Sequence, residues 1–242
     1  MRLLTAIVLS FSLSCPVQAA ETDLDRVLEL AGVSLLCEQT LPLLQRGMSD
    51  AQQKTLAPLF AAGPLCADLA RQVAPKLDAQ QLDAALQLLD SPLARHFTEA
   101  ERAVAKDGGL AAYRQQLQQR PPLQARLELV RRLDQAAHTT ELATLLRYEV
   151  GKTQALLALR ERGGDLDEQA LAEQTAAQLA PLRSSSASGV EAFMLYAYRA
   201  TPSAQLGEYA ALYEQPPLQA VLQASTQALP AVFAARRAKL KK

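Results

Sequence analysis

The sequence is poor in the residues that most often carry catalysis. It has two histidines, His96 and His138, and three cysteines in 242 residues. No Cys-x-x-Cys pair is present, which argues against a thioredoxin-like redox centre. His96 and Glu99 lie one helical turn apart and could share a metal ion, but two ligands do not make a site, so a solvent-facing or capping role fits better. We therefore expect no catalytic residue, no metal, no cofactor and no enzymatic activity.

Three further absences narrow the fold and the partners. Runs of β-branched and aromatic residues are few, so strands are not indicated. Beyond the start of the chain, no stretch approaches the roughly 20 apolar residues of a transmembrane helix. Basic and acidic residues number 25 each, which argues against a basic nucleic-acid-binding protein. Because 49% of the residues are hydrophobic, the chain can still form a packed core.

The first residues, 1–19, have the pattern of a secretory signal peptide. Arg2 gives the positive start, an apolar run follows, and the small residues that end at Ala19 suit signal peptidase. We expect cleavage near Ala19 and a periplasmic or secreted mature protein. A lipoprotein leader that is acylated at Cys15 is the alternative, although Pro16 directly after the cysteine disfavours it.

Cleavage would leave two cysteines, Cys37 and Cys66, in a compartment where disulfides persist. We expect them to form a disulfide. It would close a loop of about 30 residues and contribute about 3–4 kcal/mol in the chain-entropy model. Two buried free thiols are the alternative, because both cysteines lie among apolar residues where they could simply pack.

Helical patterns run through almost the whole chain. Alanine, leucine, glutamine and arginine are abundant, and apolar residues recur at helical spacing. Capping patterns mark three helix starts: Ser49 with Gln52, Asp78 with Gln81, and Ser91 with Pro92. The glycine pairs at 108–109 and 163–164 end helices, a break is expected near His138, and residues 184–189 are the clearest loop. We expect an all-α bundle of about ten helices.

Two series of these helices look alike. At an offset of 124 residues, segment 81–92 aligns with 205–216, which pairs Leu82 with Leu206 and Pro92 with Pro216. The alignment predicts an internal duplication in which two amphipathic units bury their faces against each other, with chance similarity as the alternative. The expected organisation is as follows: a signal peptide over 1–19, a first helical half over 20–107, a connector over 108–121, a second half over 122–235 and a basic tail over 236–242.

Basic charge is concentrated at the C-terminal end. Five of the last seven residues, beginning with Arg236 and Arg237, are basic. Without these five and Arg2, the body of the protein has 19 basic and 25 acidic residues. The basic tail could make weak contact with anionic lipid at about 1 kcal/mol per charge. The simpler prediction is that these side chains are solvated at a helix C-terminus, where they complement the helix dipole.

The segment 198–216 is similar to the signature of a family of secreted or periplasmic bacterial all-helical domains of unknown function. In that family a helix with apolar and aromatic residues runs to a Tyr-x-Ser-Pro-like break, and a second amphipathic helix follows. The second half keeps Tyr213 but has glutamine in place of the serine. The first half keeps Ser91 and Pro92 but has Leu89 where an aromatic residue is usual. The resemblance implies an envelope-facing helical protein and transfers no catalytic residue.

Four of the six tyrosines, Tyr196, Tyr198, Tyr209 and Tyr213, lie within 18 residues on two successive expected helices. Tyr209 and Tyr213 are four residues apart and so share a helix face. A groove lined by these rings could bind an apolar or peptide ligand, since each ring offers a flat body and a polar tip. Ordinary half-buried packing is the alternative.

With so little chemistry, the sequence favours a non-enzymatic protein of the cell envelope that binds a protein or peptide partner. The alternative is a carrier of a lipid or another apolar small molecule in a cavity between helices, which a deep apolar cavity would favour. A third interpretation, an enzyme whose site is assembled from scattered residues, would require acids clustered with one of the histidines.

Overall fold

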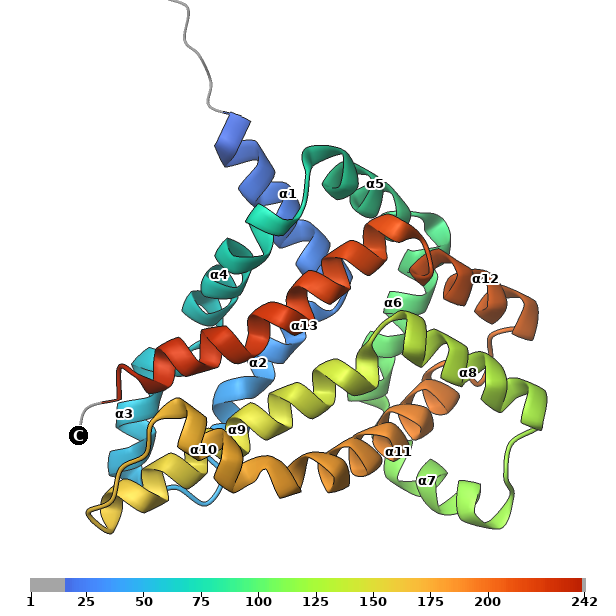
Figure 1. Ribbon diagram of the computed structural model, residues 1–242. Helices are drawn as coiled ribbons and strands as arrows, with labels where there is room; N and C mark the ends of the chain where they lie inside the picture. The colour runs from blue at the N-terminus through green and yellow to red at the C-terminus, as the bar shows by residue number, and fades with distance from the viewer. Residues whose placement is uncertain (1–15, 241–242) are drawn as a thin grey trace, which may run out of the picture.

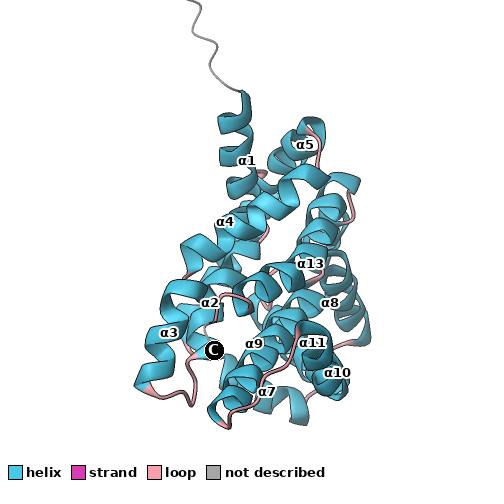
Figure 2. Cartoon of the chain, turned by 60° about the vertical axis from the view of Figure 1, so that its left-hand side comes forward, coloured by secondary structure: helices cyan, strands magenta, loops and turns pink. Residues whose placement is uncertain are grey.

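The computed structural model describes residues 16–240, and this part of the chain is helical almost throughout (Figure 1; Figure 2). It contains thirteen α-helices, two short 3-10 helices and no strand. The α-helices are α1 (Pro16–Leu30), α2 (Val33–Leu44), α3 (Asp50–Phe60), α4 (Ala62–Val73), α5 (Ala79–Leu89), α6 (Pro92–Asp107), α7 (Leu110–Gln119), α8 (Gln124–Ala136), α9 (Thr139–Glu161), α10 (Glu168–Thr175), α11 (Leu179–Ala197), α12 (Ser203–Tyr213) and α13 (Pro216–Arg237). The 3-10 helices are Ala74–Lys76 and Ala176–Gln178. The expected all-α, multi-helix fold is confirmed.

Helix starts follow the capping patterns of the sequence. At α3, the Ser49 side chain accepts from the Gln52 amide while the Gln52 side chain accepts from the Ser49 amide, and α5 begins with the same kind of capping box. Ser91 caps α6, and Pro92 takes its first position, where a missing N–H removes no helical hydrogen bond. Pro216 occupies the equivalent position of α13. Local sequence therefore fixes where these helices begin.

Two residues with left-handed backbone divide longer helical stretches. Gly32, with φ 76°, separates α1 from α2, and His138, with φ 52°, separates α8 from α9. Glycine adopts this conformation at little cost because it has no Cβ. The His138 ring is held on both sides, by Glu141 Oε2 at 2.7 Å from Nδ1 and Gln219 Oε1 at 3.2 Å from Nε2. The break at His138 confirms the expectation, whereas the hydrophobic pattern does not mark the break at Gly32.

Helix α13 is central to the packing. It crosses the molecule diagonally in Figure 1 and packs against α4, α5 and α9. Its first half buries Leu218, Val221 and Leu222 in the larger core cluster, which it shares with α1, α2, α4, α5, α6, α8, α9, α11 and α12. Its second half enters a smaller cluster with α2, α3, α9 and α10, where Phe233 meets Phe60 at 5.6 Å between ring centroids. One long helix thus joins both cores.

Helix positions and contacts recur between the two halves. The starts of α5 and α12 are 124 positions apart (203 − 79), and so are the starts of α6 and α13 (216 − 92). Helix α1 packs on α5 as α8 packs on α12, and α2 packs on α4 as α9 packs on α11. The last helix of each half packs on the other half: α6 contacts α11 and α12, and α13 contacts α4 and α5. These contacts agree with two similar halves, and the duplication itself stays a prediction that superposition of the two hairpins would test.

The prediction of a loop over residues 184–189 is wrong, because these residues lie inside α11. Ser186 is buried, and the NH1 group of Arg147 donates to Ser185 Oγ at 2.8 Å and to Ser186 Oγ at 3.1 Å. Serine and glycine disfavour an isolated helix. Their small side chains suit the surface where α11 packs on α9, so tertiary packing outweighs local propensity.

The basic tail was expected to span residues 236–242, but its first two residues belong to α13 and their side chains are not solvated. Helix α13 continues through Arg237, and both Arg236 and Arg237 are buried in ion pairs. Arg236 pairs with Asp68 and also donates to backbone carbonyls of α3 and α4. These two cations are therefore withdrawn from any membrane surface. Lys239 is exposed, and the last two residues lie outside the described part.

The expected leader over 1–19 falls largely outside the described residues, as does Cys15, because the description begins at Pro16. Among the described helices, no single one has both the length and the apolar character of a membrane span. The segments Asp23–Leu30 and Val33–Leu44, bent by 72° at their junction, meet those criteria only when taken as a pair.

Candidate functional site

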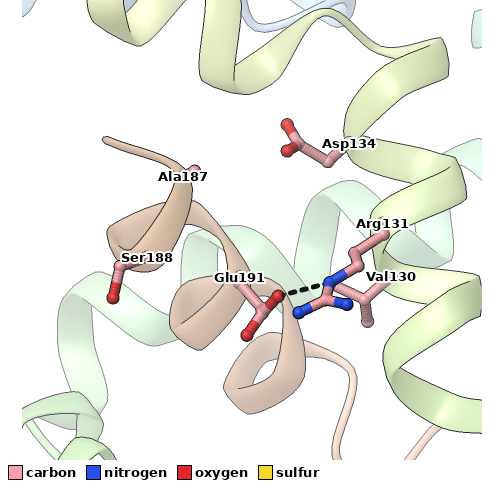
Figure 3. Close-up of a pocket in the computed structure, with 6 residues that line it drawn as sticks. All are labelled: Val130, Arg131, Asp134, Ala187, Ser188 and Glu191. Atoms are coloured by element: carbon pink, nitrogen blue, oxygen red, sulfur yellow. Dashed lines mark hydrogen bonds and ion pairs between the residues drawn. The ribbon is translucent and has the colours of Figure 1, made fainter. Parts of the chain in front are cut away.

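A cleft with a volume of about 430 Å³ lies between α8 and α11. Its lining residues are drawn in Figure 3: Val130, Arg131 and Asp134 from α8, and Ala187, Ser188 and Glu191 from α11. Four of these six side chains are polar or charged. We name this site the α8/α11 cleft.

Helical register decides which side chains border the α8/α11 cleft. Val130 is buried in the core, and Arg131 and Asp134 lie one turn apart on the flank of α8. Ser188 and Glu191 are also one turn apart on α11. Ala187 and Ser188 have small side chains, so space remains between the two helices, and the longer side chains of Arg131 and Glu191 border it.

One ion pair crosses the cleft. Arg131 Nε donates to Glu191 Oε2 at 2.8 Å, the dashed line of Figure 3. The two side chains are 59% and 32% exposed. Exposed pairs of this kind contribute only about 0.2–1 kcal/mol to stability. Both groups can therefore exchange partners with a ligand without a large change in the stability of the fold.

Asp134 is held at the edge of the cleft by the first turn of α9. Its carboxylate accepts from the Thr140 amide and from Thr140 Oγ1, each at 2.7 Å. The side chain thus satisfies an amide of α9 that has no partner within its own helix. A carboxylate has about four acceptor positions, so Asp134 can accept from a ligand while it caps α9.

The chemistry of the α8/α11 cleft suits recognition. Its lining carries two carboxylates, one guanidinium and one hydroxyl, a formal charge of minus one from one basic and two acidic groups. It includes no histidine or cysteine that could activate Ser188 or act as a nucleophile. Within residues 16–240, no group of three His, Cys, Asp or Glu side chains could hold a metal ion. The arrangement can hold a basic or amide group by hydrogen bonds.

Three tyrosines of the expected groove form a packed aromatic cluster. Tyr198, Tyr209 and Tyr213 are buried together with Phe97. The Phe97 ring stacks on Tyr209 at 4.0 Å between centroids and meets Tyr198 edge-on at 5.0 Å. Tyr209 meets Tyr213 edge-on at 5.1 Å. Packing, the alternative that the sequence left open, describes these side chains, and they do not line the α8/α11 cleft.

Tyr196, the fourth tyrosine, is also buried but belongs to a separate contact between α6 and α11. Its hydroxyl donates to Asp107 Oδ2 at 2.5 Å. The Arg199 guanidinium lies 4.0 Å from the centre of the Tyr196 ring and pairs with Asp107 at 2.8 Å. The structure thus places the four sequence-predicted tyrosines in two packing contacts.

Glu101 places a titratable carboxyl against the aromatic cluster. It accepts a hydrogen bond from the Tyr198 hydroxyl at 2.5 Å. Burial raises the pKa of Glu101 by more than the Tyr198 hydrogen bond and the nearby Arg102 lower it. Burial and the nearby Glu101 carboxyl also raise the pKa of Tyr198 well above its usual value. Folding therefore makes the neutral form of Glu101 more favourable than it is in the unfolded chain.

We expect Glu101→Gln to stabilise the protein at neutral and higher pH. A raised pKa in the fold gives a stability contribution that is present below the unfolded pKa of about 4.3 and is lost as the pH rises through the folded value. Glutamine stays neutral and still accepts from Tyr198, so its advantage should be absent near about pH 4 and grow toward about pH 8. Urea unfolding across this range measures it, with Glu99→Gln, an exposed neighbour on α6, as the matched control. If the difference in unfolding free energy between the glutamine variant and the wild type were constant with pH, the raised pKa of Glu101 would be contradicted.

Sequence reasoning did not single out Arg131, Asp134, Ser188 or Glu191. The ion pair joins residues 60 positions apart, and no local motif connects them. The sequence pattern also places Ser188 in a loop, which hides its position on a helix face. A one-turn spacing of charges on α8 is the only local signal, and many exposed helices have it.

Comparison of the chain with protein families, with curated proteins and with solved structures finds no match. The resemblance to a secreted helical family therefore stays a prediction. The functional proposal is therefore guided by the geometry of the molecule and by its own sequence.

Proposed function

We propose that this is a non-enzymatic, exported helical protein that binds a protein or peptide partner at the α8/α11 cleft. The observation that carries the proposal is the exposed Arg131–Glu191 pair beside the fixed carboxylate of Asp134. Because acidic groups outnumber basic ones in the lining, the partner segment should present a lysine or arginine. Charge complementarity of this kind gives an interface its specificity and orientation.

A peptide suits the cleft better than an apolar cargo does. A volume of about 430 Å³ accommodates a few side chains. Carboxylates and a guanidinium border it. In the free protein these groups form hydrogen bonds with water, so they favour a partner whose polar groups can take the place of that water. The carrier alternative requires an apolar lining, which this cleft does not provide.

Export is the second part of the proposal. It rests on the leader pattern of residues 1–19 and on the two cysteines, whose Cα atoms are 5.7 Å apart at a disulfide distance. Disulfides persist mainly in extracellular and periplasmic compartments.

Site-specific photo-crosslinking in the cell of origin tests the binding site. A benzoylphenylalanine replaces Ala187 in the cleft or, as a control position, the exposed Ala79 on α5. We expect a covalent adduct of one defined mass from position 187 and none from position 79. Glu191→Lys should lower the yield of this adduct about tenfold, because it reverses one of the two acidic charges.

The matched control is Glu208→Lys, which makes the same charge change at an exposed acid of α12 outside the cleft. It should leave the adduct unchanged, and thermal unfolding of both variants should match that of the wild type. Equal adducts from positions 187 and 79, or an adduct that is indifferent to Glu191→Lys, would contradict the proposed site.

A further inference from the structure

A second cleft, with a volume of about 350 Å³, lies where the end of α2 meets α9 and the start of α11. Arg46 comes from the turn after α2, Arg147 and Gln154 come from α9, and Leu182 comes from α11. We name this site the α2/α9 cleft. It differs from the α8/α11 cleft in charge, since its lining holds two arginines and no carboxylate.

Neither arginine of the α2/α9 cleft has an acidic partner among the residues that the structure describes. Many other arginines of the described chain pair with carboxylates, among them Arg131 and Arg132. Arg147 donates only to serine hydroxyls, which are neutral, and among residues 16–240 no carboxylate lies within ion-pair distance of Arg46 or Arg147. Two exposed arginines therefore line one cleft, and neither is paired with a carboxylate in the described part of the chain.

The end of α2 does not explain the position of Arg46. A basic side chain at a helix C-terminus often complements the free carbonyl groups there. Here Gln154 Nε2 donates to the carbonyl oxygens of Leu43 at 3.3 Å and Leu44 at 3.2 Å. Gln154 thus donates to the carbonyls at the end of α2 and holds α9 against it. The Arg46 guanidinium is therefore available to donate to another acceptor.

The floor of the cleft is partly apolar and partly open. Leu43, Val150 and Leu182 supply apolar surface. Gly151 adds no side chain, and a Cβ built there would lie 3.5 Å from Gln178 Oε1, which is ordinary contact. A side chain longer than a methyl group at 151 would therefore extend past this contact into the cleft between α9 and the start of α11.

We propose that the α2/α9 cleft binds the anionic group of a small amphiphile, a carboxylate or a phosphate, whose apolar part contacts the leucine and valine surface. The planar guanidinium groups of Arg46 and Arg147 match both anions in geometry and charge. The apolar floor favours a short hydrocarbon chain over a bare ion. This site is separate from the proposed partner cleft, so either can fail while the other holds.

Isothermal titration of the full chain with three probes tests the proposal: decanoate, decyl phosphate and inorganic phosphate, each below its micelle concentration. The wild type should bind decanoate, decyl phosphate or both, and either one at least about tenfold more tightly than inorganic phosphate. The ratio of the two decyl probes identifies whether the natural ligand carries a carboxylate or a phosphate. No binding of either decyl probe would overturn the proposal, and so would inorganic phosphate that binds as tightly as the tighter of the two decyl probes.

Variants place the binding in the cleft. Arg46→Gln and Arg147→Gln should each weaken binding of the decyl probe at least about tenfold. Gly151→Leu keeps both arginines, improves helix propensity and fills the space, so it should abolish binding without unfolding the protein. Arg162→Gln removes one exposed charge at the end of α9, outside the cleft, and should leave affinity within about twofold. Binding that survives Gly151→Leu would place the ligand elsewhere and overturn the assignment.

Discussion

Replacing Arg237 with methionine is expected to lower the free energy of unfolding by about 3–5 kcal/mol. The Arg237 side chain is 1% exposed and lies between two carboxylates. Its NH2 group donates to Glu149 Oε2 at 2.5 Å and Glu168 Oε1 at 2.6 Å, and its Nε donates to Glu168 Oε2 at 2.9 Å. Without Arg237, the 2% exposed Glu149 would keep Lys152, at 3.5 Å, as its one cationic partner among residues 16–240. An uncompensated buried charge is among the most destabilising single changes.

The loss should depend on pH. Burial raises the pKa of Glu149 even though Arg237 and Lys152 lower it. Removing Arg237 raises that pKa further, so Glu149 becomes neutral more readily in the variant. The destabilisation should therefore be smallest in acid, where the Glu149 carboxyl is neutral in both the folded and the unfolded variant. It should be largest above neutral pH, where the unfolded chain has an ionised carboxylate and the folded variant must either bury that charge or take up a proton.

Arg132→Met is the matched control, because it removes a guanidinium from an equally short but exposed pair. Arg132 donates to both oxygens of Glu214 at 2.6 Å, with the two side chains 45% and 43% exposed. Its loss should cost less than about 1 kcal/mol in urea unfolding. Adding Glu149→Gln to Arg237→Met should restore part of the stability. Equal losses for Arg132→Met and Arg237→Met would contradict the burial argument.

The buried ion pairs show why the C-terminal end could not be predicted from the sequence. Arg237 meets Glu149 and Glu168 across 88 and 69 residues, and a row of basic residues near a terminus is usually solvated. One signal was present. The buried face of α13 includes Leu229 and Phe233, and a step of four residues from Phe233 leads to Arg237.

Features set by a few neighbouring residues could be predicted well. The capping box of Ser49 with Gln52, Pro92 at the start of α6 and the break at His138 depend on local hydrogen bonds or backbone geometry, and the structure has all three. Residues 184–189 could not be placed by local propensity, because what keeps them helical is the contact of α11 with α9. Both clefts depend on such distant pairings, so the sequence alone did not reveal them.

The second large effect is expected at the cysteines: Cys37→Ser should lower the free energy of unfolding by about 2–4 kcal/mol. Cys37 on α2 and Cys66 on α4 are 29 positions apart, with Cα atoms 5.7 Å apart, and the two helices pack together. A bridge there removes conformations from the unfolded chain while the folded chain already holds the two residues in place. Urea unfolding with and without reductant measures the loss, and reduction should lower the stability of the wild type by a similar amount.

Cys66→Ser is the matched variant, because it removes the same bridge from the other end. Cys37 is buried and Cys66 is half-buried, so serine at 37 adds the burial of a hydroxyl and serine at 66 adds less. Cys66→Ser should therefore lose slightly less stability than Cys37→Ser, and neither variant should respond to reductant. Two titratable thiols in wild-type protein purified without reductant from an oxidising compartment would contradict the bridge. A wild type that unfolds at the same urea concentration before and after reduction would show that the bridge, even if formed, contributes no stability.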